Sequence, residues 1–387
     1  MNDSLQLVFV LHNHQPVGNF DEVFTTAYER SYKPYLQIAS RYEQFRFGLH
    51  ISGPLFEWLE DNRREYFDQL ALLVERGQVE ILSGAFYEAV LTMLSDRDRR
   101  AQLELMNERI EKRFGVRPRG IWLAERVWEQ CVVKDIADAG LEYTLLDDHH
   151  FKLAGIPASD LDGYFTAEDR GESISVFPIS EKLRYLIPFS SPQQIAEFLA
   201  VYNGRGSLLV YGDDGEKLGL WPHTHETVYE QGWLERFFRM LHDNSAHIQL
   251  ALPSEVVENT PPRGRCFLPD ASYREMTEWA LPVRSHNKLV NVQKKLENSG
   301  LLNEVRPFLK GHPGVTSARA IPNPPTCTPT SARCLDSSRK LSRTTRTTQP
   351  LLGPRSICFA VSATVRTGTA FSAGYTCPTF ATRCIPN

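Results

Sequence analysis

The sequence has 387 residues, 42% apolar and 11% aromatic, which is enough for one large globular domain with a sizeable core and a smaller additional segment. The formal net charge is −4 and no basic stripe with interleaved aromatics occurs before residue 310, so nucleic acid is not expected as a partner. The only early apolar run, residues 7–11, is too short to span a membrane and follows the acidic Asp3. These features predict a cytoplasmic protein without a membrane partner.

Composition changes abruptly near residue 311. Residues 1–311 carry a formal charge of −12, whereas residues 312–387 carry +8 and contain a single acidic residue, Asp336. Five of the seven cysteines also fall in the second segment, which leaves Cys131 and Cys266 in the first. Such a low number of cysteines is consistent with a reducing compartment. Both thiols are expected to be buried and to fill space in the apolar core.

Short apolar, β-branched or aromatic runs alternate along the chain with longer amphipathic stretches. The predicted strands are residues 5–11, 47–51, 79–82, 120–123, 143–146, 174–177 and 207–211. The predicted helices are residues 63–76, 97–114, 132–139 and 228–243. Strands that alternate with helices predict an α/β fold with a parallel sheet wrapped by helices, most simply an incomplete parallel (β/α)7-type barrel.

Polar clusters follow four of the predicted strands, at the end of the strands where barrel enzymes carry their chemistry. They are His12 with His14, Glu125, Asp147 with Asp148, and Asp213 with Asp214. We therefore expect these side chains to line one site at the carboxyl ends of the strands.

Residues 122–129 place an acid between two tryptophans at the end of a predicted strand. Glycosidases need a carboxylate nucleophile, and aromatic faces stack on sugar rings, so Glu125 and Trp122 fit such a site. The alternative is structural, with Arg126 forming an ion pair with a nearby glutamate.

Residues 211–222 contain two adjacent carboxylates, Asp213 and Asp214, and end with Trp221 and a proline. Two neighbouring carboxylates resist joint ionisation, which raises one pKa toward the value that a general acid needs. An Asp-Asp-Gly turn is the structural alternative.

These two strings resemble the third and fourth sequence regions of glycoside hydrolase family 57. His-Asn-His-Gln-Pro at 12–16 resembles the first region, and the string at 77–84 resembles the second. Residues 267–273, followed by Glu278-Trp279, are similar to the segment that precedes the helical part of the 4-α-glucanotransferase and α-amylase branch. The resemblance covers about residues 5–310.

The resemblance implies a retaining enzyme that acts on α-1,4-glucans or maltooligosaccharides through a covalent glycosyl-enzyme, without a metal or cofactor. Glu125 matches the family's nucleophile and Asp214 its acid/base. The residues expected to bind substrate are His12, His14, Glu80, Trp122, Asp213, Trp221 and His223. His14 also fits a structural histidine, and Glu80 also fits an ion-pair partner in the floor of the site. The balance between transferase and hydrolase, the chain-length preference and the oligomeric state are not predicted.

Two other functions compete with this interpretation. His12 and His14 after the first strand also suit a metal-dependent barrel hydrolase, although Lys and His ligands are not suitably placed on the middle strands. A catalytically dead carbohydrate-binding remnant is the third hypothesis.

The domain prediction is a catalytic barrel at 1–280, the start of a truncated helical subdomain at 281–311 and an aberrant segment at 312–387. The last segment has no helical or strand periodicity and is predicted to be disordered and out of frame. Read from the third base of each codon, residues 360–379 allow a string with Tyr-Trp-His-Gly that resembles the family's fifth region. Residues 313–317 and 320–324 allow Trp-Arg-Asn-Phe and Tyr-Pro-Glu-Ser in the same frame. One slip near residue 310 accounts for these ordered matches.

Overall fold

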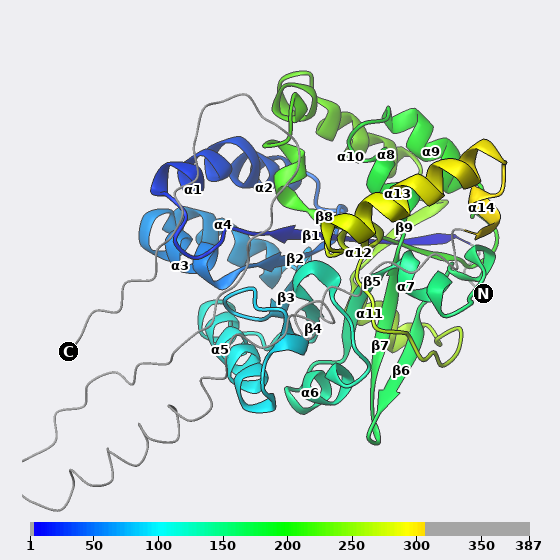
Figure 1. The fold of residues 1–387 in the computed structure, drawn as a ribbon. Helices are drawn as coiled ribbons and strands as arrows, with labels where there is room; N and C mark the ends of the chain where they lie inside the picture. The colour runs from blue at the N-terminus through cyan, green and yellow to red at the C-terminus, as the bar shows by residue number, and fades with distance from the viewer. Residues whose placement is uncertain (1–3, 306–387) are drawn as a thin grey trace, which may run out of the picture. The chain divides into compact units, whose positions relative to one another are not determined.

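The computed structural model describes residues 4–305, which contain the predicted barrel and the start of the helical segment (Figure 1). The predicted out-of-frame segment at 312–387 lies outside the described residues.

Seven parallel strands form a closed ring in the order β1-β2-β3-β4-β5-β7-β8. The ring closes because β1 pairs with β2 on one side and with β8 on the other. Its strands are β1 (Leu5–Asn13), β2 (Phe47–Ile51), β3 (Val79–Gly84), β4 (Gly120–Trp122), β5 (Tyr143–Asp147), β7 (Glu172–Ile179) and β8 (Leu208–Asp214). All seven predicted strands are present, and the prediction of a (β/α)7-type barrel is confirmed.

Two further strands were not predicted. β6 (Phe165–Asp169) pairs antiparallel with β7 as a hairpin, and β9 (Ile248–Ala251) runs parallel to the first residues of β1. Both are short and partly solvent-exposed, so neither presents the continuous apolar run that identifies a buried strand.

Helices surround the barrel (Figure 1). They are α1 (Asp21–Ala27), α2 (Lys33–Ala39), α3 (Gly53–Asn62), α4 (Arg64–Glu75), α5 (Asp96–Phe114), α6 (Val132–Asp138), α7 (Asp148–Leu153), α8 (Glu181–Leu186), α9 (Pro192–Ala200), α10 (Trp233–Asp243), α11 (Pro253–Asn259), α12 (Arg274–Trp279), α13 (Val283–Asn298) and α14 (Leu302–Val305). Among residues 4–305, no helix is long and apolar enough to cross a membrane.

The four predicted helices correspond to α4, α5, α6 and α10. The boundaries of α5 follow from capping, because Ser95 accepts a hydrogen bond from the Asp98 amide and Gly115 ends the helix with a φ of 70°. The prediction placed the start of α10 too early. A π-helical turn, Glu226–Glu230, and a left-handed Gly232 come before it.

Inward-facing side chains fill the barrel. A glycine occupies a strand position where a large side chain on the adjacent strand leaves no space for a Cβ. A Cβ on Gly84 of β3 would lie 2.2 Å from Nε2 of His50 on β2. His50 is fully buried, so its imidazole occupies the space that a side chain at position 84 would need. This packing places a histidine inside the barrel, near the carboxyl ends of the strands.

The two cysteines in the described part of the chain are free thiols. Cys266 packs in an apolar cluster with Leu268 and Phe165, as expected of a buried filler. Cys131 is only partly buried, and its Sγ lies 3.7 Å from a carboxylate oxygen of Glu129. The prediction of two buried thiols is therefore correct for Cys266 alone.

Candidate active site

A cluster of acidic side chains lies at the carboxyl ends of the strands. Glu125 follows β4, Asp214 ends β8, Glu216 lies in the turn after β8, and Glu88 lies in the loop after β3. Burial raises the pKa of Glu88, and the charges of Glu125, Asp214 and Glu216 raise it further; burial, Asp213 and Glu125 raise the pKa of Asp214. The structure thus brings Glu125 and Asp214, which are separate in the sequence, into one electrostatic unit.

Glu125 lies in a strained turn. Its φ is 52° and that of Arg126 is 47°, a left-handed conformation that is uncommon for residues with side chains and that concentrates at functional sites. The Tyr273 hydroxyl donates a hydrogen bond to Glu125 Oε2 at 2.7 Å, and the Ser272 hydroxyl donates to the Glu125 carbonyl oxygen at 2.5 Å. Backbone hydrogen bonds between Trp128 and Ala271 hold the two segments together. The carboxylate of Glu125 is therefore fixed in one orientation.

If Glu125 is the nucleophile that the resemblance to family 57 implies, replacing Tyr273 by phenylalanine should lower kcat roughly 10–100-fold, because a hydrogen bond to a charged group contributes about 1.5–3 kcal/mol. The ring can keep its packing against the Arg126 guanidinium, 4.5 Å from the ring centre, so the fold should remain intact. Steady-state kinetics on maltooligosaccharides would measure the effect. An unchanged kcat would show that this hydrogen bond does not position Glu125 for reaction.

Asp214 has a pKa raised to about 6 by burial, by the neighbouring Asp213 and by Glu125, against the opposing effect of Arg126. Asp213 has a different environment. It is 1% exposed and forms ion pairs with Lys217 at 2.6 Å and with Arg184 at 3.5 Å. The two adjacent aspartates thus differ, since Asp213 is held by cations and Asp214 has the raised pKa.

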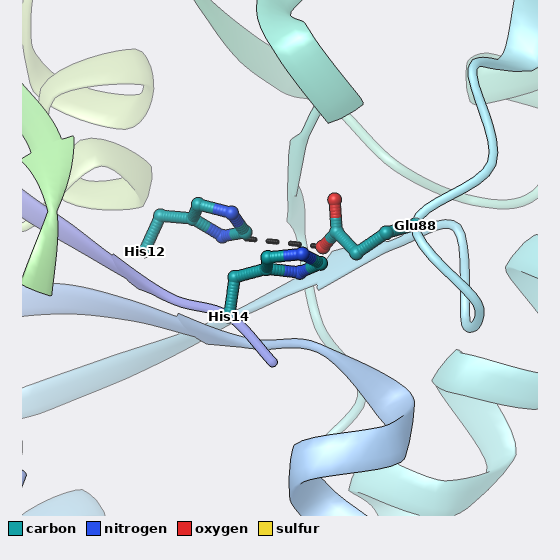
Figure 2. A group of neighbouring side chains, drawn as sticks. All are labelled: His12, His14 and Glu88. Atoms are coloured by element: carbon teal, nitrogen blue, oxygen red, sulfur yellow. Dashed lines mark ion pairs between the residues drawn. The ribbon is translucent and has the colours of Figure 1, made fainter. Parts of the chain in front are cut away.

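Three histidines, His12, His14 and His50, lie beside the acids, and Figure 2 shows the first two with Glu88. The ring of His12 stacks on Trp122 at 5.0 Å and on His14 at 5.6 Å, and its Nδ1 lies 2.7 Å from Nδ1 of His50. Burial lowers the pKa of His12 and His14, and it lowers that of His50 to about 3. Glu88 Oε1 lies 3.6 Å from His50 Nδ1 and 4.0 Å from His12 Nδ1. Because burial raises the pKa of Glu88 well above its ordinary value, these contacts join mainly neutral groups.

Glu216 connects β1 to the turn after β8. It accepts a hydrogen bond from the His14 amide at 2.7 Å and another from the Tyr32 hydroxyl. Burial and the charge of Asp214 raise its pKa to about 8. A protonated Glu216 adds no further negative charge beside Asp214 at neutral pH.

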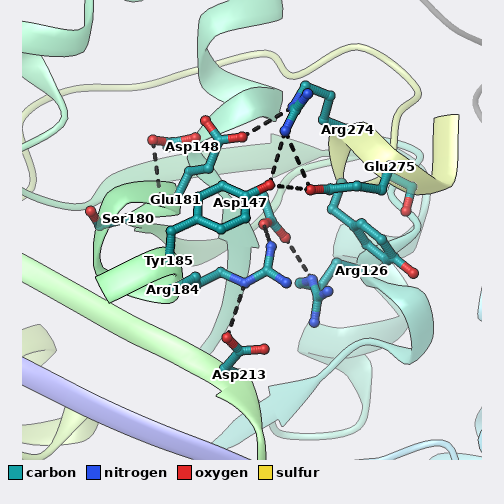
Figure 3. A network of polar contacts seen from close by, with 12 residues as sticks. Arg126, Asp147, Asp148, Ser180, Glu181, Arg184, Tyr185, Asp213, Arg274 and Glu275 are labelled. Carbon is teal, nitrogen blue, oxygen red and sulfur yellow. Dashed lines mark hydrogen bonds and ion pairs between the residues drawn. The ribbon is translucent and has the colours of Figure 1, made fainter. Parts of the chain in front are cut away.

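A buried ion-pair network lies under the acidic cluster (Figure 3). Asp147 forms an ion pair with Nε of Arg126 at 2.6 Å, and it accepts a hydrogen bond from Nη1 of Arg184 at 2.7 Å. Arg184 also approaches Asp213, which binds Lys217. The alternative ion pair expected for Arg126 does exist, but its partner is Asp147 rather than a glutamate. The Arg126–Asp147 ion pair is present together with Glu125 in the acidic cluster. The structural and the catalytic interpretations of residues 122–129 are therefore compatible.

The neighbouring Asp148 does not join the acidic cluster. Its carboxylate pairs with Lys152 at 2.8 Å and accepts a hydrogen bond from the Glu181 amide at 3.4 Å. It therefore connects α7 to α8, beside the network of Figure 3.

Glu80, expected to contact sugar, is not part of the cluster. It lies near the amino-terminal end of β3, where it accepts hydrogen bonds from the Tyr143 hydroxyl at 2.8 Å and from the Ser254 amide and hydroxyl at 3.1 and 2.9 Å. Both carboxylate oxygens are therefore engaged at the opposite end of the barrel from Glu125. The alternative, a structural partner in the barrel floor, agrees with this position, although the partners are Tyr143 and Ser254 rather than Arg or His.

The three remaining predicted residues lie in different environments. Trp122 is 1% exposed and packs against His12 and the Arg126 guanidinium, so almost none of its ring is open to a sugar. Trp221 is 46% exposed, with Lys217 Nζ 5.6 Å from its ring centre. His223 is exposed and has a φ of 62°. Of the two predicted tryptophans, only Trp221 presents its ring to solvent.

Paired acidic groups at the carboxyl ends of barrel strands are the arrangement used by enzymes that cleave glycosidic bonds. Residues 8–269 match the sequence model of glycosyl hydrolase family 57, and the chain belongs to this family. It is 44% identical over 313 residues to alpha-amylase 1 of Dictyoglomus thermophilum, covering 80% of this chain and 46% of that protein. It is 42% identical over 311 residues to the 4-alpha-glucanotransferase of Thermococcus litoralis, covering 80% and 47%.

The crystal structure of the Thermococcus litoralis 4-alpha-glucanotransferase is similar to this fold with a TM-score of 0.77, over 80% of this chain and 49% of that one. A branching enzyme from Pyrococcus horikoshii shares the fold at a TM-score of 0.56 and 16% identity, over 70% of this chain and 73% of that one. The chain spans about half the length of the curated relatives it matches.

Proposed function

We propose that this barrel is the catalytic domain of a retaining enzyme that acts on α-1,4-glucans, as an α-amylase or a 4-α-glucanotransferase. Glu125 is the nucleophile and Asp214 is the acid/base. The proposal rests on the different environments of Glu125 and Asp214 within one acidic cluster. Tyr273 fixes the carboxylate of Glu125, while Asp214 has a pKa raised to about 6. The names of the relatives, alpha-amylase 1 and 4-alpha-glucanotransferase, support the substrate class.

The proposed reaction has two steps. Glu125 attacks the anomeric carbon while Asp214 protonates the leaving oxygen, which gives a covalent glycosyl-enzyme. Asp214, now a carboxylate, then removes a proton from the acceptor that attacks this intermediate. Water as acceptor gives hydrolysis, and a glucan hydroxyl gives transfer. The exposed ring of Trp221 is a candidate stacking surface for the glucan.

The test is the configuration of the first product. Incubation of the full chain with maltooligosaccharides, followed by proton NMR at early times, should show the α-anomer first, as retention requires. Chromatography of the same samples would separate transfer products, which are longer than the substrate, from hydrolysis products. Initial formation of the β-anomer would contradict a glycosyl-enzyme on Glu125.

The pH dependence of kcat/KM should reflect the pKa of Asp214. A general acid works only while protonated, so kcat/KM should fall as the pH rises through about 6, the pKa of Asp214. Asp213→Asn removes the adjacent charge that raises this pKa and frees its cationic partners, so the alkaline limb should move to lower pH. Asp243→Asn, at an exposed position at the end of α10, is the control and should leave the limb in place. A shift to higher pH in Asp213→Asn would refute the assignment of Asp214.

The two competing functions explain less of the site. A metal-dependent hydrolase based on His12 and His14 would leave Glu125 and Asp214 without a role in the reaction. A dead carbohydrate-binding remnant would not need a strained, fixed Glu125 beside an aspartate with a raised pKa. Measurement of product formation from maltooligosaccharides, with and without a chelator, separates all three functions.

We also propose that the segment at 312–387 is read out of frame, on the codon argument above. Nucleotide sequencing across codons 300–315 is expected to locate one insertion or deletion. The corrected chain should then be more stable to heat and more active in glucan transfer than the present one when both are assayed in parallel. Equal activity and equal melting temperatures would reject the frameshift.

A further inference from the structure

Two histidines and one glutamate converge at the mouth of the barrel (Figure 2). His12 and His14 are two residues apart at the end of β1, and Glu88 reaches them from the loop after β3. One donor atom from each of the three residues lies within 4.8 Å of the other two. Two histidines and one carboxylate are a common ligand set for first-row divalent metals.

The donor atoms are suited to a metal. Nδ1 of His14 and Oε1 of Glu88 are buried and make no hydrogen bond within the described residues. The contact between Nδ1 of His12 and Nδ1 of His50 holds the ring of His12 in place.

The surrounding charge also favours a cation. The carboxyl groups of Glu125, Asp214 and Glu216 all interact electrostatically with Glu88. A dication bound among these carboxyl groups would be the largest local charge and would be attracted to them. Arg126, the nearby cation, is already paired with Asp147.

We propose that His12, His14 and Glu88 form a binding site for a divalent transition metal such as Zn²⁺, and that the bound metal blocks the catalytic cleft. Coordination needs bonds of about 2.0–2.2 Å, which small rotations of the three side chains can supply. The ion would lie beside Glu125, whose charge acts on His14, where a bound sugar must be placed. The blocking step rests on the proposed function, whereas metal binding does not.

Calorimetric titration of the full chain with Zn²⁺ tests the site. The cysteines are alkylated first, so that thiolates do not compete for the metal. His14→Ala and Glu88→Gln should each weaken one equivalent of Zn²⁺ binding by at least the roughly 10–100-fold that follows loss of an outer contact in a metal site. His242→Ala, at an exposed position on α10, is the matched control and should bind as the parent does. Melting curves without metal identify any variant that fails to fold.

Two further measurements complete the test. Co²⁺ bound at this site should show d–d absorption without a thiolate charge-transfer band, and saturating maltooligosaccharide should weaken Zn²⁺ binding. Absence of Zn²⁺ binding, or equal binding by the parent and both variants, overturns the site. Binding that maltooligosaccharide does not weaken overturns the blocking step. Calorimetry measures Zn²⁺ binding without turnover. Its result therefore tests the metal site independently of the roles of Glu125 and Asp214 in catalysis.

Discussion

Glu125→Gln is expected to abolish both hydrolysis and transfer of maltooligosaccharides, with a loss on the order of 10⁴–10⁶-fold in kcat, the scale seen when an enzyme loses its nucleophile or its base. The amide keeps the shape of the side chain and can still accept a hydrogen bond from Tyr273, so the site should keep its geometry. It cannot attack the anomeric carbon effectively. Binding of maltooligosaccharide, measured by calorimetry, should change little.

The matched control is Glu172→Gln, an exposed glutamate at the start of β7, which should retain the parent's activity. A direct measurement of the nucleophile is also available. A fluorinated glucosyl fluoride forms a slowly hydrolysed glycosyl-enzyme, and mass spectrometry of the digested protein should find the label on Glu125. Near-normal turnover in Glu125→Gln, or a label on another carboxylate, would remove Glu125 from the nucleophile role.

The barrel could be predicted because its strands are apolar on both faces. β2, for example, is buried at all five positions, and such runs stand out in a sequence. β9 could not be recognised in this way, since it has four residues and only the first is fully buried. The edge helices α12 and α13 likewise bury few side chains, so their apolar spacing gives a weak signal.

The candidate site could be predicted only where a polar side chain directly follows the end of a strand. Glu125 and Asp214 follow strands directly, and the barrel brings strand ends together. The same rule argues against Glu80 as a contact to sugar, since Glu80 lies near the amino-terminal end of β3. Position within a strand is therefore a better guide to this site than residue type.

Several site residues were missed because their partners are distant in the sequence. Tyr273 contacts Glu125 across 148 residues, and His50 contacts His12 across 38. Glu216 lies within the motif that contains Asp214, but its contact with the His14 amide requires β1 and β8 to be neighbours. Strand order, which the sequence pattern does not supply, determines these contacts.

The ion-pair network under the cluster should dominate the stability of the site. Asp147→Asn is expected to lower the free energy of unfolding by about 3–5 kcal/mol, because it leaves the buried guanidinium of Arg126 and the largely buried one of Arg184 without their shared counter-charge. Chemical denaturation would measure this change. Asp169→Asn is the control, since Asp169 pairs with the half-exposed Arg170 on the β6–β7 hairpin and such pairs contribute about 0–1 kcal/mol.

The pH dependence of this effect has a definite sign. Burial on its own would raise the pKa of Asp147, but Arg126 and Arg184 together hold it below its ordinary value. A carboxyl group with a lowered pKa in the folded state stabilises the fold above its unfolded pKa, about 3.9, and loses that contribution as the pH falls through the folded value. The stability difference between the parent and Asp147→Asn should therefore be largest near neutral pH and shrink below about pH 4. A difference of less than about 1 kcal/mol at neutral pH, the scale of a surface pair, would show that the two arginines do not depend on Asp147.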